Sequence, residues 1–166
     1  LWIRNKLRKN KPIPIHTENG LPKVISILGE DHEVLVNDQN IIEPIKIFNN
    51  QLLISHTVTH LNVKWIIISR LKKIMKKEVE IYADFIAKKL DITFNNISLR
   101  DTSSRWGSCS RQGNISLSWR LVLAPRHVME YVIIHELCHL LEMNHSPRFW
   151  KLVNDICPEY TVSKLW

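Results

Sequence analysis

The sequence predicts an α+β fold, in which antiparallel strands pack against one long helix and one shorter, buried helix. Two patterns predict it: short runs rich in Val and Ile occur in two separate stretches, and a long amphipathic segment lies between them. The composition agrees, because 166 residues with 45% apolar and 23% charged residues can bury one core. We expect a β-rich N-terminal region over residues 1–61 and a second region over residues 62–166, joined in one compact unit.

The N-terminal region is expected to form a small antiparallel sheet. Gly29 and asparagine-rich segments separate four runs of β-forming residues, which lie at residues 24–28, 33–36, 45–48 and 52–54. Before them, residues 1–11 have the pattern of a basic helical end that Pro12 stops. The chain begins with Leu1 rather than Met, so we expect that this region is truncated at its start.

A long helix is expected from Asn62, a suitable N-cap, to about Leu90. Apolar residues recur at helical spacing on one of its faces: Ile67, Leu71, Ile74, Met75, Tyr82, Phe85 and Ile86. The lysines between residues 72 and 77 lie on the other face, where we expect solvent. No aromatic side chain is interleaved among them as a stacking platform, so we expect no nucleic-acid partner.

The second β section precedes two further helices. Its three strands are expected at residues 97–100, 104–110 and 114–119. The turn at residues 111–114 joins the last two as a hairpin. Pro125 suits the first turn of a buried helix that runs to about residue 142, and Asn144 can adopt the left-handed conformation that ends it. Ser146 then caps another helix, which Pro158 ends.

Composition excludes several classes of protein. The net charge of +7 and the pI near 9.5 suit an anionic ligand, or solubility alone. No apolar run approaches the roughly 18 residues of a membrane span, so no membrane partner is expected. The four glycines cannot form a glycine-rich phosphate loop. Cys109, Cys138 and Cys157 form no CxxC pair, which suggests reduced thiols in the cytoplasm.

The motif that carries chemistry is HExxH, at residues 135–139 inside the expected buried helix. Side chains four residues apart share a helical face, so His135 and His139 can reach one metal ion. Glu136 is near enough to hold a water on that ion. Zinc is the expected metal, since three protein ligands leave a fourth position for water. A chance match is expected on the order of 0.02 times, and burying these groups without a metal would be costly.

The third ligand must come from outside the motif. His145 lies beyond the expected helix end, where the chain turns and can aim its imidazole back at the metal. Glu142 is the rival, because it follows His139 by three residues on roughly the same face. We rank His145 first, since a ligand that leaves the helix completes a tetrahedron more easily.

The remaining histidines show no metal geometry. His56 and His60 would stand about 13 Å apart in a strand, too far to chelate one ion, and are expected at the surface. His127 has no evident partner. Cys138 should point to a different face from His139 and is expected to be a core thiol.

From residue 103 onward the sequence resembles the YgjP-like metal-dependent hydrolases, or metallopeptidases. Two blocks carry the resemblance: residues 104–109 (SRWGSC), and residues 135–139 (HELCH) followed by NHSP at 144–147 and FW at 149–150. The resemblance is specific over about residues 95–160. Before residue 95 it extends only to the general architecture, a β section followed by a long helix. It implies a zincin-like fold with distant SprT-like relatives. It also implies His135, His139 and His145 as metal ligands and Glu136 as the catalytic carboxylate.

The resemblance leaves the substrate open. Members are labelled metallopeptidases, and a UTP pyrophosphatase activity has also been attributed to the family. We therefore expect a peptidase, or else a nucleoside triphosphate hydrolase at the same metal site; a non-catalytic, metal-stabilised binding module is the third alternative. Arg105 is our candidate for stabilising developing negative charge, although it could instead pair with Asp101. Trp106 and Trp150 could line the cleft, but core packing is the stronger explanation for both.

Overall fold

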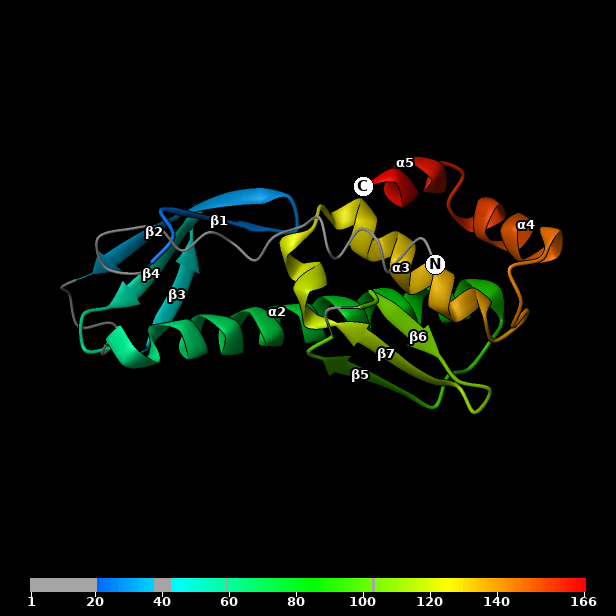
Figure 1. Ribbon diagram of the computed structural model, residues 1–166, viewed down its shortest axis with the longest axis horizontal. Coiled ribbons are helices and arrows are strands. Elements are labelled where there is room, and N and C mark those ends of the chain that lie inside the picture. The colour runs from blue at the N-terminus through cyan, green and yellow to red at the C-terminus, as the bar shows by residue number, and fades with distance from the viewer. Residues whose placement is uncertain (1–20, 38–42, 59, 103) are drawn as a thin grey trace.

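A computed structural model describes residues 21–37, 43–58, 60–102 and 104–166 (Figure 1). The expected basic helical end at residues 1–11 lies outside these residues. The architecture is mixed α and β, with two small sheets and four helices in the described part of the chain. Figure 1 shows one sheet at one end of the molecule, the second sheet and the C-terminal helices at the other, and a long helix running between them.

The first sheet has the strand order β1-β2-β4-β3. Its strands are β1 (Val24–Ile27), β2 (Glu30–Asn37), β3 (Ile45–Phe48) and β4 (Gln51–Ser55). Two tight hairpins build it, one turning at Leu28–Gly29 and the other at Asn49–Asn50, and all four turn residues have positive φ. The hairpins meet through β2 and β4, which run parallel. The expected all-antiparallel sheet is therefore wrong.

Helix α2 (His60–Leu90) joins the two ends of the molecule. It begins two residues before the expected N-cap Asn62, and Asp91, the first residue after its end, has a left-handed φ of 51°. One face of α2 is buried, and its residues recur at nearly every fourth position: Val63, Ile67, Leu71, Met75, Val79, Ala83, Ile86 and Ala87. The prediction that Phe85 belongs to the buried face is wrong, since 60% of it is exposed.

The second sheet has the order β5-β7-β6, with strands β5 (Asn96–Arg100), β6 (Gly107–Cys109) and β7 (Asn114–Ser118). The predicted β6–β7 hairpin is confirmed, but β5 pairs with β7 in parallel, so this sheet is mixed as well. A 3₁₀ helix, η1 (Trp119–Leu123), follows β7 where the sequence suggested that the strand continued.

Helix α3 (Arg126–Cys138) lies at the centre of the second region. It contacts α2, η1, β6, α4 (Pro147–Ile156) and the short α5 (Tyr160–Leu165), which was not predicted. One continuous hydrophobic core includes Ile54 of the first sheet, Leu71 of α2 and Ile134 of α3. The domain boundary at residues 61 and 62 stays a prediction. Among the described residues, no helix is long and apolar enough to cross a membrane.

Candidate metal centre

The HExxH pentapeptide lies at the C-terminal end of α3. His135 and Glu136 are in the last turn, and His139 is the C-cap residue. All three are buried, with exposed fractions of 4%, 3% and 9%. The apolar run before the motif explains this burial, because it packs α3 between the second sheet and the other helices.

The structure brings His135, His139 and His145 together. One nitrogen from each lies within 4.8 Å of the others, and Nε2 of His135 is 2.9 Å from Nε2 of His145. Three nitrogens around a tetrahedral zinc ion at 2.0–2.1 Å would stand about 3.4 Å apart. These three are the only such group of metal-ligating residues in the described part of the chain, so the donor set fits one metal ion.

The turn after α3 delivers His145 to this point. The helix ends at Cys138 rather than near Glu142, and Asn144 does not have the expected positive φ. The N–H groups of Leu140 and Glu142 bond to carbonyls in the last turn of α3, which wraps the chain tightly around the helix end. Ser146 then caps α4 as predicted, its Oγ accepting a hydrogen bond from the N–H of Phe149 at 3.3 Å.

Glu142 contributes its backbone to the site. Its carboxylate does not join the histidine group, but its carbonyl oxygen lies 3.1 Å from Nδ1 of His139. A carbonyl only accepts hydrogen bonds, so Nδ1 carries the proton and the Nε2 lone pair is available to a metal. The geometry thus favours His145 over Glu142 as the third ligand.

Partial or full removal from water favours the neutral form of the imidazoles, of which His145 is the most exposed. Burial lowers the pKa of His135 to about 3, with smaller contributions from His139 and His145. The pKa values of His139 and His145 are also lowered, chiefly by burial. The phenolic oxygen of Tyr131, which is itself buried, lies 3.5 Å from Nδ1 of His135. Neutral imidazole is the form that binds metal ions.

An aromatic floor supports the three histidines. The ring of Phe149 is centred 4.9 Å from that of His135, 4.6 Å from that of His139 and 4.8 Å from that of His145. Trp150 stacks on His145 with ring centres 5.7 Å apart. In the sequence, Phe149 stood out only as part of the FW block of the family resemblance, without a role at the metal site. Its position four residues after His145, one turn along the next helix, was the available signal.

Glu136 lies against the backbone of β6. Burial raises the pKa of its carboxyl to about 8, and the positive charge of Arg105 partly opposes this effect. A Cβ atom at Gly107 would stand only 2.5 Å from Oε1 of Glu136. Sequence reasoning missed this contact, although a glycine inside a strand is typical of close approach by another group.

We expect the substitution Gly107→Ala to destabilise the fold by about 2 kcal/mol, because the added methyl group overpacks a site already in contact with a buried carboxyl. Denaturant unfolding measures the effect. The matched control is Ser108→Ala, which alters the neighbouring, half-buried residue of the same strand. Equal stability of the two variants would contradict the close packing of β6 on α3.

The predicted substrate residues have different environments. Arg105 is exposed in the loop before β6, and it is Arg120 that pairs with Asp101. Trp106 is buried in the core, where its ring lies 5.9 Å from that of Trp166. Trp150 is half-buried beside His145. A role of these residues in substrate binding stays a prediction.

Among the described residues, the histidine group includes none of the other singled-out side chains. His56 is exposed, as expected, and His60 begins α2. His127 bonds to the hydroxyl of Ser163 at 2.9 Å. Cys138 is fully buried, as expected of a core thiol. All three cysteines of the chain are free.

Comparison with known proteins extends the resemblance to the whole chain. A family model described as YgjP-like, metallopeptidase domain, matches residues 1–166, beyond the stretch at 95–160 that the motifs covered. No curated protein and no solved structure matches the chain. The chain therefore belongs to the YgjP-like metallopeptidase-domain family, whose name points to a metal-dependent hydrolase.

Proposed function

We propose that the protein is a zinc-dependent peptide hydrolase with a zincin-like HExxH site. The observation that carries this proposal is the meeting of three imidazoles beside one buried carboxyl, on a helix packed against a sheet. His135, His139 and His145 would hold the metal, and Glu136 would be the general base. The three free thiols support a reducing compartment such as the cytoplasm.

The donor set suits zinc best among common divalent ions. Three neutral imidazoles and no carboxylate make a nitrogen site, whereas magnesium and calcium prefer oxygen ligands. The bond from His139 Nδ1 to the Glu142 carbonyl is the kind of outer contact that orients a ligating imidazole. When bound, zinc would lower the pKa of a coordinated water to about 7 and polarise the scissile carbonyl.

Glu136 would perform the proton transfers. Its buried carboxyl is adjacent in sequence to the proposed ligand His135, and a bound cation would favour the ionised form that a general base needs. It would accept a proton from the attacking water and give it to the leaving amine nitrogen. Gly107 supports this role, because the absent side chain leaves room for the carboxyl between α3 and β6.

The position of β6 favours a peptide substrate. Among the described strands, β6 forms one edge of the second sheet, and it contacts α3, the helix that carries the histidines (Figure 1). A free strand edge can bind an extended peptide through backbone hydrogen bonds. A peptide added to β6 would pass close to Glu136, which lies directly against that strand.

A nucleoside triphosphate hydrolase is the second candidate. Arg100 and Arg105 line a cavity on the same sheet, and guanidinium groups suit phosphate oxygens. The third alternative, a non-catalytic metal-stabilised module, is less well supported, because a structural site needs no base and usually closes its fourth position.

One assay separates these candidates. The zinc-loaded protein is incubated with a denatured protein and, separately, with UTP, and each reaction is repeated with the Glu136→Gln variant. We expect cleavage of the denatured protein that depends on Glu136. Glu136-dependent release of pyrophosphate from UTP, without proteolysis, would replace the peptidase proposal by the second candidate. Metal binding without either activity would leave the non-catalytic, metal-stabilised module as the remaining candidate.

Removal of the Tyr131 hydroxyl is expected to weaken zinc binding by about tenfold, since outer partners of a ligating histidine contribute 10–100-fold to affinity. Tyr131→Phe keeps the buried ring and deletes the oxygen beside Nδ1 of His135. Chelator competition measures the zinc dissociation constant. Tyr160→Phe is the control, because the Tyr160 ring stacks on Tyr131 without a hydrogen bond to that histidine. Equal affinities in the two variants would contradict the orienting role of Tyr131.

A further inference from the structure

One face of the second sheet carries a row of hydroxyl groups. Ser98, Ser116 and Ser108 are paired in register across β5, β7 and β6, and the Oγ atoms of Ser98 and Ser116 lie 3.1 Å apart. Successive side chains of a strand point to opposite faces, so Ile115 and Leu117 face the core while the serines face away from it. This serine row needs an explanation other than core packing.

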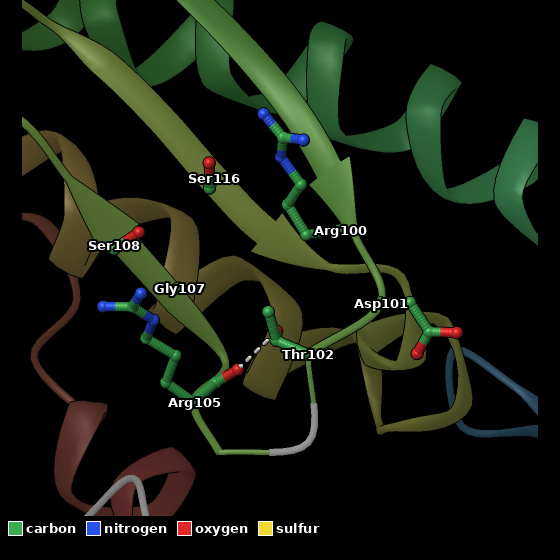
Figure 2. Close-up of a pocket in the computed structure, with 7 residues that line it drawn as sticks. All are labelled: Arg100, Asp101, Thr102, Arg105, Gly107, Ser108 and Ser116. Atoms are coloured by element: carbon green, nitrogen blue, oxygen red, sulfur yellow. Dashed lines mark hydrogen bonds between the residues drawn. The ribbon is translucent and has the colours of Figure 1, made fainter.

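A cavity of about 360 Å³ opens at one end of the serine row. It is lined by Arg100, Asp101, Thr102, Arg105, Gly107, Ser108 and Ser116. Figure 2 shows Arg100, Ser116 and Ser108 on three adjacent strands, with the side chain of Arg105 extending along β6 toward Ser108. The volume lies in the range of small-ligand pockets.

The cavity has an excess of positive charge. Among the described residues, neither Arg100 nor Arg105 forms a salt bridge. The acid that lines the cavity, Asp101, is paired with Arg120, which lowers its pKa, and its side chain points away from both guanidinium groups (Figure 2). The Ser116 hydroxyl is hydrogen-bonded to Ser98, and that of Thr102 donates to the Arg105 carbonyl, so two guanidinium groups and the Ser108 hydroxyl remain as donors suited to an oxyanion.

The cavity and Glu136 lie on opposite faces of β6, because Ser108 faces away from the core whereas the side-chain position of Gly107 meets Glu136. Gly107 lines the cavity and also contacts Glu136. A peptide paired with the edge of β6 would pass between the cavity and Glu136, so its side chains on the cavity face would reach the arginines. Every second side chain of a peptide along β6 would face this side of the sheet.

We propose that the cavity lined by Arg100 and Arg105 binds an oxyanion of the substrate, a carboxylate or a phosphate, on the face of the sheet opposite Glu136. As a statement about the substrate it rests on the proposed hydrolase function, whereas anion binding by itself does not. The proposed enzyme would thus prefer substrates that carry a negative charge on this flank. Two of the chain's many basic residues would then bind substrate in this cavity, whereas the lysines of α2 are expected to face solvent.

Calorimetric titration of the zinc-loaded Glu136→Gln variant tests anion binding without turnover. The probes are inorganic phosphate and two capped tripeptides, acetyl-Ala-Glu-Ala-amide and acetyl-Ala-Gln-Ala-amide. We expect a millimolar or tighter dissociation constant for at least one of the two anions. Adding Arg100→Gln or Arg105→Gln should raise it about tenfold, the typical effect of losing one hydrogen bond to a charged group. Arg111→Gln, which changes an exposed arginine outside the cavity, should not alter it.

The probes also identify the source of the oxyanion. Binding of the Glu peptide but not the Gln peptide assigns it to a carboxylate side chain, and binding of phosphate alone assigns it to a phosphorylated substrate. Absence of binding by both anions, or a dissociation constant that neither cavity substitution changes, would overturn the proposal. Hydrolysis is not measured, so a failure of the proposed function would not affect this result.

Discussion

Replacement of Glu136 by glutamine is expected to lower kcat by about 10³-fold, within the range that general acid–base catalysis contributes. The amide has the same shape as the carboxyl but cannot accept the proton of the attacking water. Zinc content should stay unchanged, because Glu136 is not among the three ligating residues. Stability should also change little, since burial already favours the neutral form of this carboxyl in the metal-free protein. Steady-state kinetics, zinc analysis and denaturant unfolding measure the three quantities.

Glu142→Gln is the matched control for this experiment. Glu142 is half-buried near the site, and its contact with His139 is made by the backbone carbonyl, which the substitution preserves. We expect nearly wild-type kcat and zinc content. If the Glu136→Gln variant kept most of the wild-type rate, Glu136 would be excluded as the general base, whatever the control showed.

Truncation of His145 to alanine is expected to weaken zinc binding by more than the roughly 100-fold that loss of an outer partner can cause. The substitution removes one of the three nitrogens, and the two that remain both belong to the end of α3. Activity should fall in proportion to the zinc lost. Elemental analysis after dialysis and chelator competition give the zinc content and the affinity.

The neighbouring residue provides a control for the loop. Asn144→Ala changes an exposed side chain next to His145 and should leave zinc affinity unchanged. Normal zinc content in His145→Ala would contradict the assignment of this ligand and would favour Glu142. Equal losses in both variants would show that the loop conformation, rather than the imidazole, determines the affinity.

Local signals predicted much of the fold. The Pro125 and Ser146 starts, the β6–β7 turn and the span of α2 each depend on a few neighbouring residues, and the structure has all of them. The two parallel pairings could not be predicted, because alternation of apolar and polar residues fixes the faces of a strand but not its neighbour or direction. The prediction that Phe85 is buried failed for a related reason. Helical spacing places this residue at the edge of the apolar face, but it does not show how far the neighbouring elements cover that face.

The candidate site, like the fold, was predictable from the sequence only in part. The HExxH spacing was sufficient to place His135 and His139 on one side of a buried helix, and the structure brings His145 to the same point. The contact between Gly107 and Glu136, the position of Phe149 under three imidazoles and the arginine cavity all join distant parts of the chain. Such juxtapositions depend on how the sheet packs on α3, which no local pattern contains.

The zinc K-edge X-ray absorption spectrum of the zinc-loaded protein tests the metal centre most directly. We predict three imidazole nitrogens at about 2.0–2.1 Å and one oxygen from water. The nitrogen count should fall in any zinc that the His145→Ala variant still retains. A shell of sulfur near about 2.3 Å, or a coordination sphere made only of oxygen, would contradict a site built from His135, His139 and His145.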